Sequence, residues 1–158
     1  MRKLFLFIST IGFLISCNTT NDDNLIKIRN GQDFLIFGHF YGECIGEVCV
    51  ETFKLTDQKI FEDTLDDYSG KKLNFVELES GKFKQVEDLI SFFPKQLLND
   101  TKTTFGCPDC TDGGGLFIQY SESGNVKSWR IDQSKDNIPS YLHSFIDKVN
   151  EKISLINN

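Results

Sequence analysis

Short apolar runs separated by polar turns occupy the chain from residue 25 to residue 78. The runs are rich in Ile, Leu, Val and Phe, which is typical of β-strands. We expect strands at residues 25–29, 33–40, 48–55, 59–63 and 73–78. Residues 115–121 and 125–132 have the same character and flank Glu122-Ser123-Gly124, which predicts a hairpin.

Helical spacing appears in two later segments. Val86, Leu89, Ile90 and Phe93 predict an amphipathic helix that Pro94 ends or bends, because proline removes a backbone donor. Pro139 suits the first turn of a longer helix, whose apolar stripe is Leu142, Phe145, Ile146, Val149, Ile153 and Ile156. Strands, helix, hairpin and helix in this order favour an α+β fold, an antiparallel sheet with two helices packed on one face.

The start of the chain has a different pattern. Arg2 and Lys3 precede an apolar stretch at residues 4–15. A bilayer-spanning helix needs about 20 residues, so this stretch fits a signal peptide better than a membrane span. It ends in Leu14-Ile15-Ser16-Cys17, which resembles the lipobox of bacterial lipoproteins. The resemblance implies that residues 1–16 are a signal peptide, cleaved after Ser16, and that the Cys17 thiol carries a diacyl lipid.

Residues 17–24 then form a polar tether ahead of a single domain at 25–158. Residues 18–24 include no apolar side chain, so we expect them to be disordered. In lipoprotein sorting, Asn18 favours the outer membrane over the inner one. Asp22-Asp23 resembles the acidic tract that exports some lipoproteins of Bacteroidota to the cell surface, so periplasmic and surface exposure both stay open. The expected partner is the membrane, through the lipid anchor.

Charge excludes one class of partner. The formal net charge is −6, and cleavage after Ser16 removes two positive charges, which leaves −8 for the mature protein. Nucleic-acid binding needs a basic surface, so we expect none. Most of the 15 phenylalanines remain after cleavage, which is enough to build a hydrophobic core.

Four cysteines remain beyond Cys17, at Cys44, Cys49, Cys107 and Cys110. Export places them in an oxidising compartment, where paired cysteines form disulfides. Three pairings are possible. We favour the local one, Cys44 with Cys49 and Cys107 with Cys110, although only geometry decides.

Other chemistry remains open for these cysteines. Cys107-x₂-Cys110 has a common zinc spacing, but Cys44-x₄-Cys49 does not. Cys107-Pro108-Asp109-Cys110 resembles the active motif of thioredoxin-type oxidoreductases, in which a helix starts at the motif. Three glycines in a row follow here, and they do not continue a helix. If the two cysteine loops meet, an oxygen-rich calcium site could form from Glu43, Glu47, Asp109 and Asp112.

The remaining candidates favour structural roles. His39 and His143 are the only histidines, and both lie beside apolar positions. Tyr120, Trp129 and Tyr141 could line a ligand surface, but such residues more often pack on a sheet. No nucleophile-elbow, zinc-protease or phosphate-loop motif is present. We therefore expect no cofactor, no metal and no catalytic residue.

Several blocks of the chain resemble a group of lipoproteins from Bacteroidota that has no established activity. The blocks are Phe37-Gly38, residues 42–49, Trp129-Arg130-Ile131-Asp132 and, as the most specific, Phe105-Gly106-Cys107-Pro108-Asp109-Cys110. The resemblance implies an outer-membrane lipoprotein and implies nothing about mechanism.

Two function classes follow. The first, which we favour, is a non-catalytic extracytoplasmic binding or envelope-associated protein of unknown ligand. The alternative is a thiol-disulfide oxidoreductase that uses Cys107 and Cys110. A structure discriminates between them, because an enzyme needs a polar pocket beside these cysteines.

Overall fold

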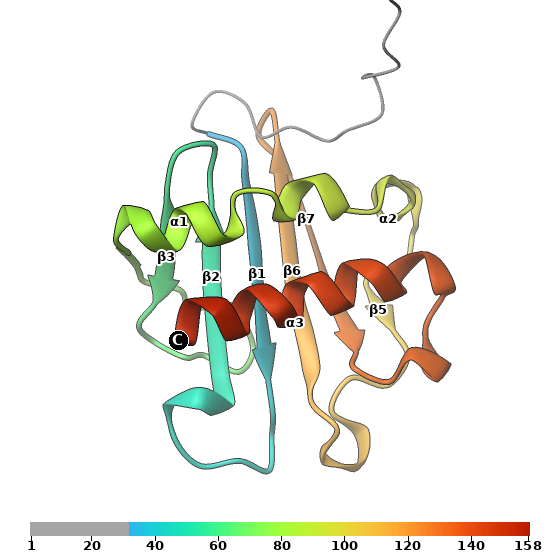
Figure 1. The fold of residues 1–158 in the computed structure, drawn as a ribbon. Helices are drawn as coiled ribbons and strands as arrows, with labels where there is room; N and C mark the ends of the chain where they lie inside the picture. The colour runs from blue at the N-terminus through green and yellow to red at the C-terminus, as the bar shows by residue number, and fades with distance from the viewer. Residues whose placement is uncertain (1–31) are drawn as a thin grey trace, which may run out of the picture.

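A computed structural model describes residues 32–158 of the chain. The expected signal peptide at 1–16, Cys17 with its tether to residue 24, and the expected strand at 25–29 lie outside the described residues. The fold is α+β, as the sequence predicts: a seven-stranded sheet lies under a layer of helices (Figure 1). No helix within residues 32–158 has both the length and the apolar character needed to cross a bilayer.

The sheet has the strand order β4-β3-β2-β1-β6-β7-β5. Its neighbours pair antiparallel except β5 and β7, which are parallel. The strand bounds are β1 Phe34–Phe40, β2 Val50–Leu55, β3 Ile60–Asp63, β4 Phe75–Glu77, β5 Thr104–Phe105, β6 Gly115–Glu122 and β7 Asn125–Asp132. The sequence did not predict β5, because two residues are too few to show an alternation.

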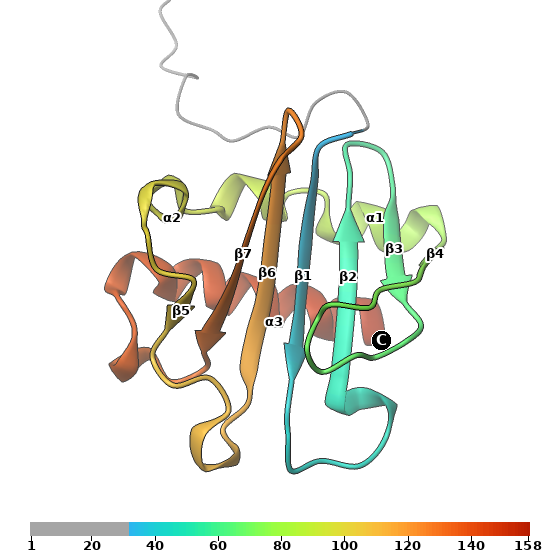
Figure 2. The same ribbon diagram turned by 180° about the vertical axis from the view of Figure 1, so that it is seen from behind.

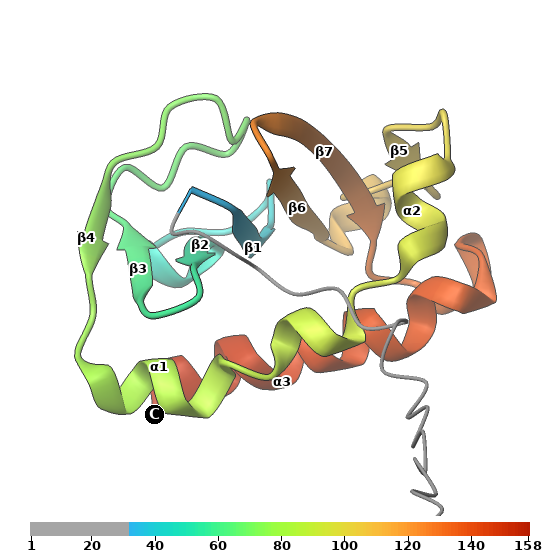
Figure 3. The same ribbon diagram turned by 90° about the horizontal axis from the view of Figure 1, so that it is seen from above.

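The helices cover one face of this sheet, as Figure 3 shows. They are α1 at Ser80–Val86, the short α2 at Lys95–Asn99 and the long α3 at His143–Asn157. The layer therefore has one helix more than the two expected. The prediction of one helix through Val86 and Phe93 is wrong in extent: α1 ends at Val86, and Leu89–Phe92 forms a 3-10 turn. Val86, Leu89 and Phe93 are all buried, so the turn satisfies the same apolar spacing.

The main core lies between the helices and the sheet. Phe93 is at its centre and contacts the rings of Tyr120, Trp129 and Phe145 at centroid distances of 4.8, 6.0 and 5.4 Å. The predicted stripe of the last helix is buried against the sheet. Aromatic contacts of this kind add to the free energy gained by area burial.

The opposite face of the sheet has only a partial cover. Ile36, Phe40 and Phe117 form a small second cluster there. The segment between β3 and β4 crosses this face (Figure 2), and its Gly70 backbone lies against the Phe117 ring. In Figure 2 this segment crosses β2 and reaches β1, and it does not extend across β7.

The chain enters the domain at one end of β1 and meets the cysteine loops at the other. At the entry end, the Ser123 backbone N–H donates to an Asp33 carboxylate oxygen at 2.7 Å. At the far end, Phe40 pairs with Gly115, next to both cysteine loops. Seven residues of strand span about 23 Å. The cysteine loops therefore lie at the opposite end of β1 from Asp33, where the described chain begins.

Phe145→Ala tests the helix layer. Phe145 is fully buried, and truncation of a buried phenylalanine typically costs about 3–5 kcal/mol of unfolding free energy. Phe92→Ala is the control, because Phe92 is 37% exposed, and it should cost less than about 1 kcal/mol. Urea denaturation measures both. Equal small losses would show that α3 does not support the sheet.

Candidate functional site

A groove of about 460 Å³ opens on the sheet face that the helices leave uncovered. Its floor consists of side chains from β6 and β7, its first wall is the loop at 69–71, and its second wall is the start of β5. The lining residues are Ser69, Gly70, Lys71, Thr103, Thr104, Phe117, Gln119, Ser128, Trp129 and Arg130. Hydroxyl, amide and cationic groups thus surround a floor that has one buried ring, Phe117.

Strand alternation builds this floor. In the β6–β7 register, Phe117 pairs with Arg130 and Gln119 pairs with Ser128. Side chains of a strand alternate between the two faces, so all four lie on the open face, while Trp129 and Tyr120 turn into the core. Tyr120 and Trp129, two of the three aromatic residues that the sequence singled out as a possible ligand surface, are therefore core residues, and the third, Tyr141, packs partly buried against the core.

A carboxylate folds the first wall. The Asp67 side chain accepts hydrogen bonds from the Ser69 hydroxyl at 2.6 Å and from the backbone N–H groups of Lys71 and Lys72 at 3.0 and 2.9 Å. These hydrogen bonds, with that from Ser69 the largest effect, lower the pKa of Asp67 to about 2. At neutral pH the Asp67 carboxylate is therefore charged, and its hydrogen bonds hold the loop in this conformation.

Arg130 fixes the inner side of that wall to the floor. Its guanidinium lies 3.6 Å from the centroid of the Phe40 ring and 5.0 Å from that of Tyr68. One Nη donates to the Tyr68 carbonyl at 3.0 Å. A cation over the face of an aromatic ring is favourable when partly desolvated, and the Phe40 and Tyr68 rings also contact each other, at 5.2 Å between centroids. The guanidinium is thus held in one position in the free protein.

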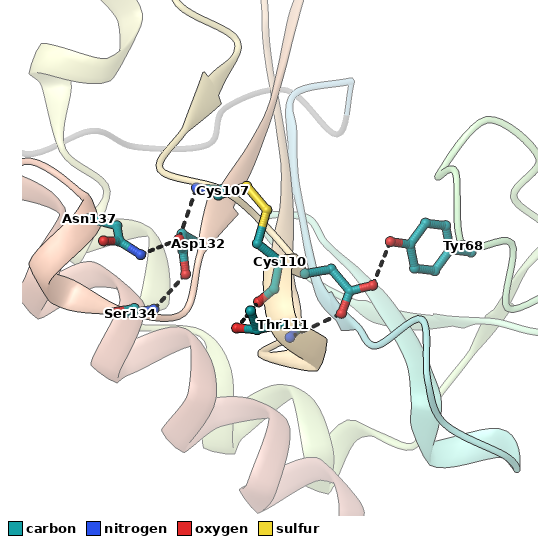
Figure 4. The surroundings of a disulfide bond; sticks show 9 residues. Tyr68, Cys107, Cys110, Thr111, Asp132, Ser134 and Asn137 are labelled. Atoms are coloured by element: carbon teal, nitrogen blue, oxygen red, sulfur yellow. Dashed lines mark hydrogen bonds between the residues drawn. A yellow bond between two sulfur atoms is a disulfide. The ribbon is translucent and has the colours of Figure 1, made fainter.

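Asp109 joins this wall to both cysteine loops. One of its carboxylate oxygens accepts from the Tyr68 hydroxyl at 2.7 Å and from the Gly42 N–H at 2.8 Å, and the other accepts from the Gly114 N–H at 3.1 Å. In Figure 4 a dashed line from the labelled Tyr68 hydroxyl marks its hydrogen bond to Asp109, beside the bond between Cys107 and Cys110. The hydrogen bond to Asp109 raises the pKa of Tyr68, so the phenol remains a donor.

The cysteines adopt the local pairing. Cys44 is bonded to Cys49, with 5.6 Å between Cα atoms, and Cys107 is bonded to Cys110, with 5.4 Å between Cα atoms. Both distances lie within the usual range for a disulfide. The prediction that each pair closes its own loop is confirmed.

Asp132 holds the second cysteine pair from behind. Its carboxylate accepts from the Cys107 N–H at 2.9 Å, the Ser134 N–H at 2.8 Å and the Asn137 amide at 2.8 Å (Figure 4). Burial alone would raise the pKa of this carboxyl, but the three hydrogen bonds outweigh burial and lower it. The Cys107–Cys110 loop is thus held by Asp109, which belongs to the loop, and by Asp132, which lies behind it.

The local backbone differs from that of a thioredoxin-type motif. Only a 3-10 turn of three residues, Cys110–Asp112, follows the motif, and Thr111 and Asp112 have φ values of 56° and 59°. A helix N-terminus beneath the first sulfur is the usual means of stabilising a thiolate. The turn provides none for Cys107, although both cysteines are solvent-exposed.

The other candidate ligands have structural surroundings. The two cysteine loops do meet, through Gly42 and Asp109, but no group of three metal-ligating side chains occurs within residues 32–158. His39 Nε2 lies 2.9 Å from the Val48 carbonyl and 3.2 Å from a Glu51 carboxylate oxygen, and His143 Nε2 lies 3.3 Å from the Ile138 carbonyl. Both histidines therefore tie backbone segments together.

The sequence singled out Asp109 and the cysteines but missed the groove itself. The alternation in β6 and β7 was a usable signal for the floor. The wall had no such signal, because Gly70 in the loop between β3 and β4 and Phe117 in β6 are far apart in sequence and meet only when the chain is folded.

Asp109→Asn tests the joint between the loops. An amide has one acceptor oxygen instead of two, so at least one of the three donors loses its partner. We expect a loss of about 1–3 kcal/mol of unfolding free energy. Asp112→Asn is the matched control: Asp112 is exposed in the same turn, and its change should stay within about 0.5 kcal/mol. Equal effects in thermal and urea unfolding would remove the special role of Asp109.

No family model matches the chain, and no curated protein matches it. The ligand chemistry of the groove must therefore be inferred from its own side chains and backbone groups.

Proposed function

We propose that this protein is a lipid-anchored extracytoplasmic binding protein that holds its ligand in the groove without changing it chemically. The lipobox at residues 14–17 and the polar tether support an anchor at Cys17, in the outer membrane and facing the periplasm or the cell surface. The protein makes no nucleic-acid contact, because the mature charge is −8.

The pre-organised wall of the groove is the observation that carries this proposal. Asp67 closes the loop, Arg130 fixes it to the floor, and Asp109 ties it to the cysteine loops. A site that is ordered in advance loses less conformational entropy when it binds. The cysteine chemistry then serves binding, because the Cys107–Cys110 bond holds Asp109 in place.

The place where the described chain begins supports the same function. The chain enters at the Asp33 end of β1, whereas the groove opens on a face of the sheet. A lipid at Cys17, linked through residues 18–32, would leave that face accessible to a partner.

Cys17→Ser tests the anchor. The wild-type chain should incorporate a labelled fatty acid and fractionate with membranes. The serine variant should incorporate no fatty acid, because it lacks the thiol that is acylated, and it should keep its signal peptide. Equal label in both chains would refute the anchor and leave the groove without an assigned compartment.

The same cells test the binding function. A photo-crosslinking amino acid at exposed Thr104, in the groove, should give a discrete adduct in the native envelope. One at exposed Asp57, in the turn between β2 and β3, should give none. Absence of any groove-specific adduct, or turnover of a disulfide substrate abolished by Cys107→Ser, would contradict the proposal.

A further inference from the structure

The strand β7 has an unpaired edge. β5 contacts it only at Arg130 and Ile131, although β7 begins at Asn125. The backbone N–H of Arg130 donates to the Thr103 carbonyl, so the backbone N–H and C=O groups of Arg130 point away from β6. Backbone groups in an antiparallel pair alternate in direction, so the N–H and C=O groups of Val126 and Ser128 also face away from β6.

The hairpin turn independently gives the same direction. Ser123 and Gly124 both have positive φ, at 52° and 82°, which is the two-residue type I′ turn. In such a hairpin the residues next to the turn, Glu122 and Asn125, form the hydrogen-bonded pair. Val126 is one residue further along the strand, so its backbone N–H and C=O groups point away from β6. No described residue bonds to the backbone N–H of Val126 or Ser128.

Space for another chain lies along this edge. The segment between α2 and β5 turns away from β7 and leaves a cleft of about 540 Å³, lined by residues 99–103 and 126–129. Thr103, Ser128 and Trp129 line both this cleft and the groove. The two hollows therefore form one continuous site at the edge of the sheet.

We propose that the free edge of β7 binds an extended, acidic peptide as an added strand beside Val126 and Ser128. This inference rests on the proposed binding function and names its ligand class. Strand addition obtains affinity from main-chain hydrogen bonds and specificity from alternate side chains.

Charge selects the acidic character. The lining of the two hollows includes the cations Lys71, Lys102 and Arg130, whereas Lys127 faces the helix side and donates to the Leu98 carbonyl. The lining acid, Asp100, already accepts from the Lys102 N–H at 2.9 Å and the Tyr141 hydroxyl at 3.3 Å. In a protein of negative net charge, these cations attract carboxylates of an added strand that point toward the open face of the sheet.

A buried hydroxyl marks the inner side of the same edge. Tyr120 is 2% exposed, and its hydroxyl has no partner among the described residues. It lines a hollow of about 150 Å³ with Leu98, Glu122, Asn125 and Lys127, and Lys127 also lines the edge cleft. Unpaired buried polar groups are rare. Because Glu122 would repel a carboxylate here, a hydroxyl or amide on the peptide is the complementary acceptor.

The cations on one side of the edge and the Tyr120 hydroxyl on the other determine which peptide should be tested. A labelled heptapeptide that alternates glutamate and threonine should bind the full chain in fluorescence anisotropy at low salt. The lysine-threonine analogue should bind at least tenfold more weakly. An analogue N-methylated on alternate amides should lose binding by a similar factor, because it cannot complete the strand pairing.

Variants test the same contacts from the protein side. Ser128→Pro deletes one outward N–H at an edge where proline is tolerated, and it should weaken binding at least tenfold. Glu77→Pro is the matched control: Leu78 donates to the Ile60 carbonyl, so the Glu77 N–H faces outward at the opposite edge of the sheet. It should leave affinity unchanged. Tyr120→Phe should weaken binding several-fold without loss of thermal stability.

Each outcome decides between the two proposals. Equal affinity for the glutamate and lysine peptides, or for the N-methylated one, would overturn strand addition. Strand addition would also be overturned if no peptide bound while the envelope experiment still gave a groove-specific adduct. That result would leave the binding function intact. Absence of the adduct itself contradicts the binding function.

Discussion

The Asp109 carboxylate accepts hydrogen bonds from three segments that are far apart in sequence, at Gly42, Tyr68 and Gly114. Its own backbone has a φ of 64°, a conformation uncommon for residues with a side chain. The Cys107–Cys110 bond closes a ring of four residues around it, and loop closure of that size contributes about 2 kcal/mol. The arrangement of the groove follows from this one residue being held in place.

Tyr68 connects Asp109 to the loop between β3 and β4 and to the floor of the groove. The Tyr68 hydroxyl contacts Asp109, its carbonyl accepts from Arg130, and its ring packs on Phe40 at 5.2 Å. The loop between β3 and β4 thereby becomes a fixed wall over β6. A cysteine motif that resembles a redox centre in sequence thus forms the support of a binding surface, and the edge of β7 lies next to that surface.

Periodic features of the fold were predictable from sequence, and features formed by distant segments were not. The apolar runs of β1, β6 and β7 and the stripe of α3 both reflect burial, so they identified the sheet and the last helix. β5 has two residues and no period, and the parallel pairing of Thr104 with Arg130 depends on the folded chain. The cysteine pairing was favoured by proximity, but the contact of Asp109 with Tyr68 had no local signal.

The most direct test of this account is amide hydrogen exchange in the Cys107→Ala/Cys110→Ala chain, compared with wild type. If the bond holds Asp109 and Asp109 holds the wall, the N–H groups of Gly70, Lys71 and Lys72 should exchange faster, while those of β1 stay protected. Unchanged exchange in the loop, with loss of a disulfide-reducing activity, would contradict the account and make the cysteines a redox centre.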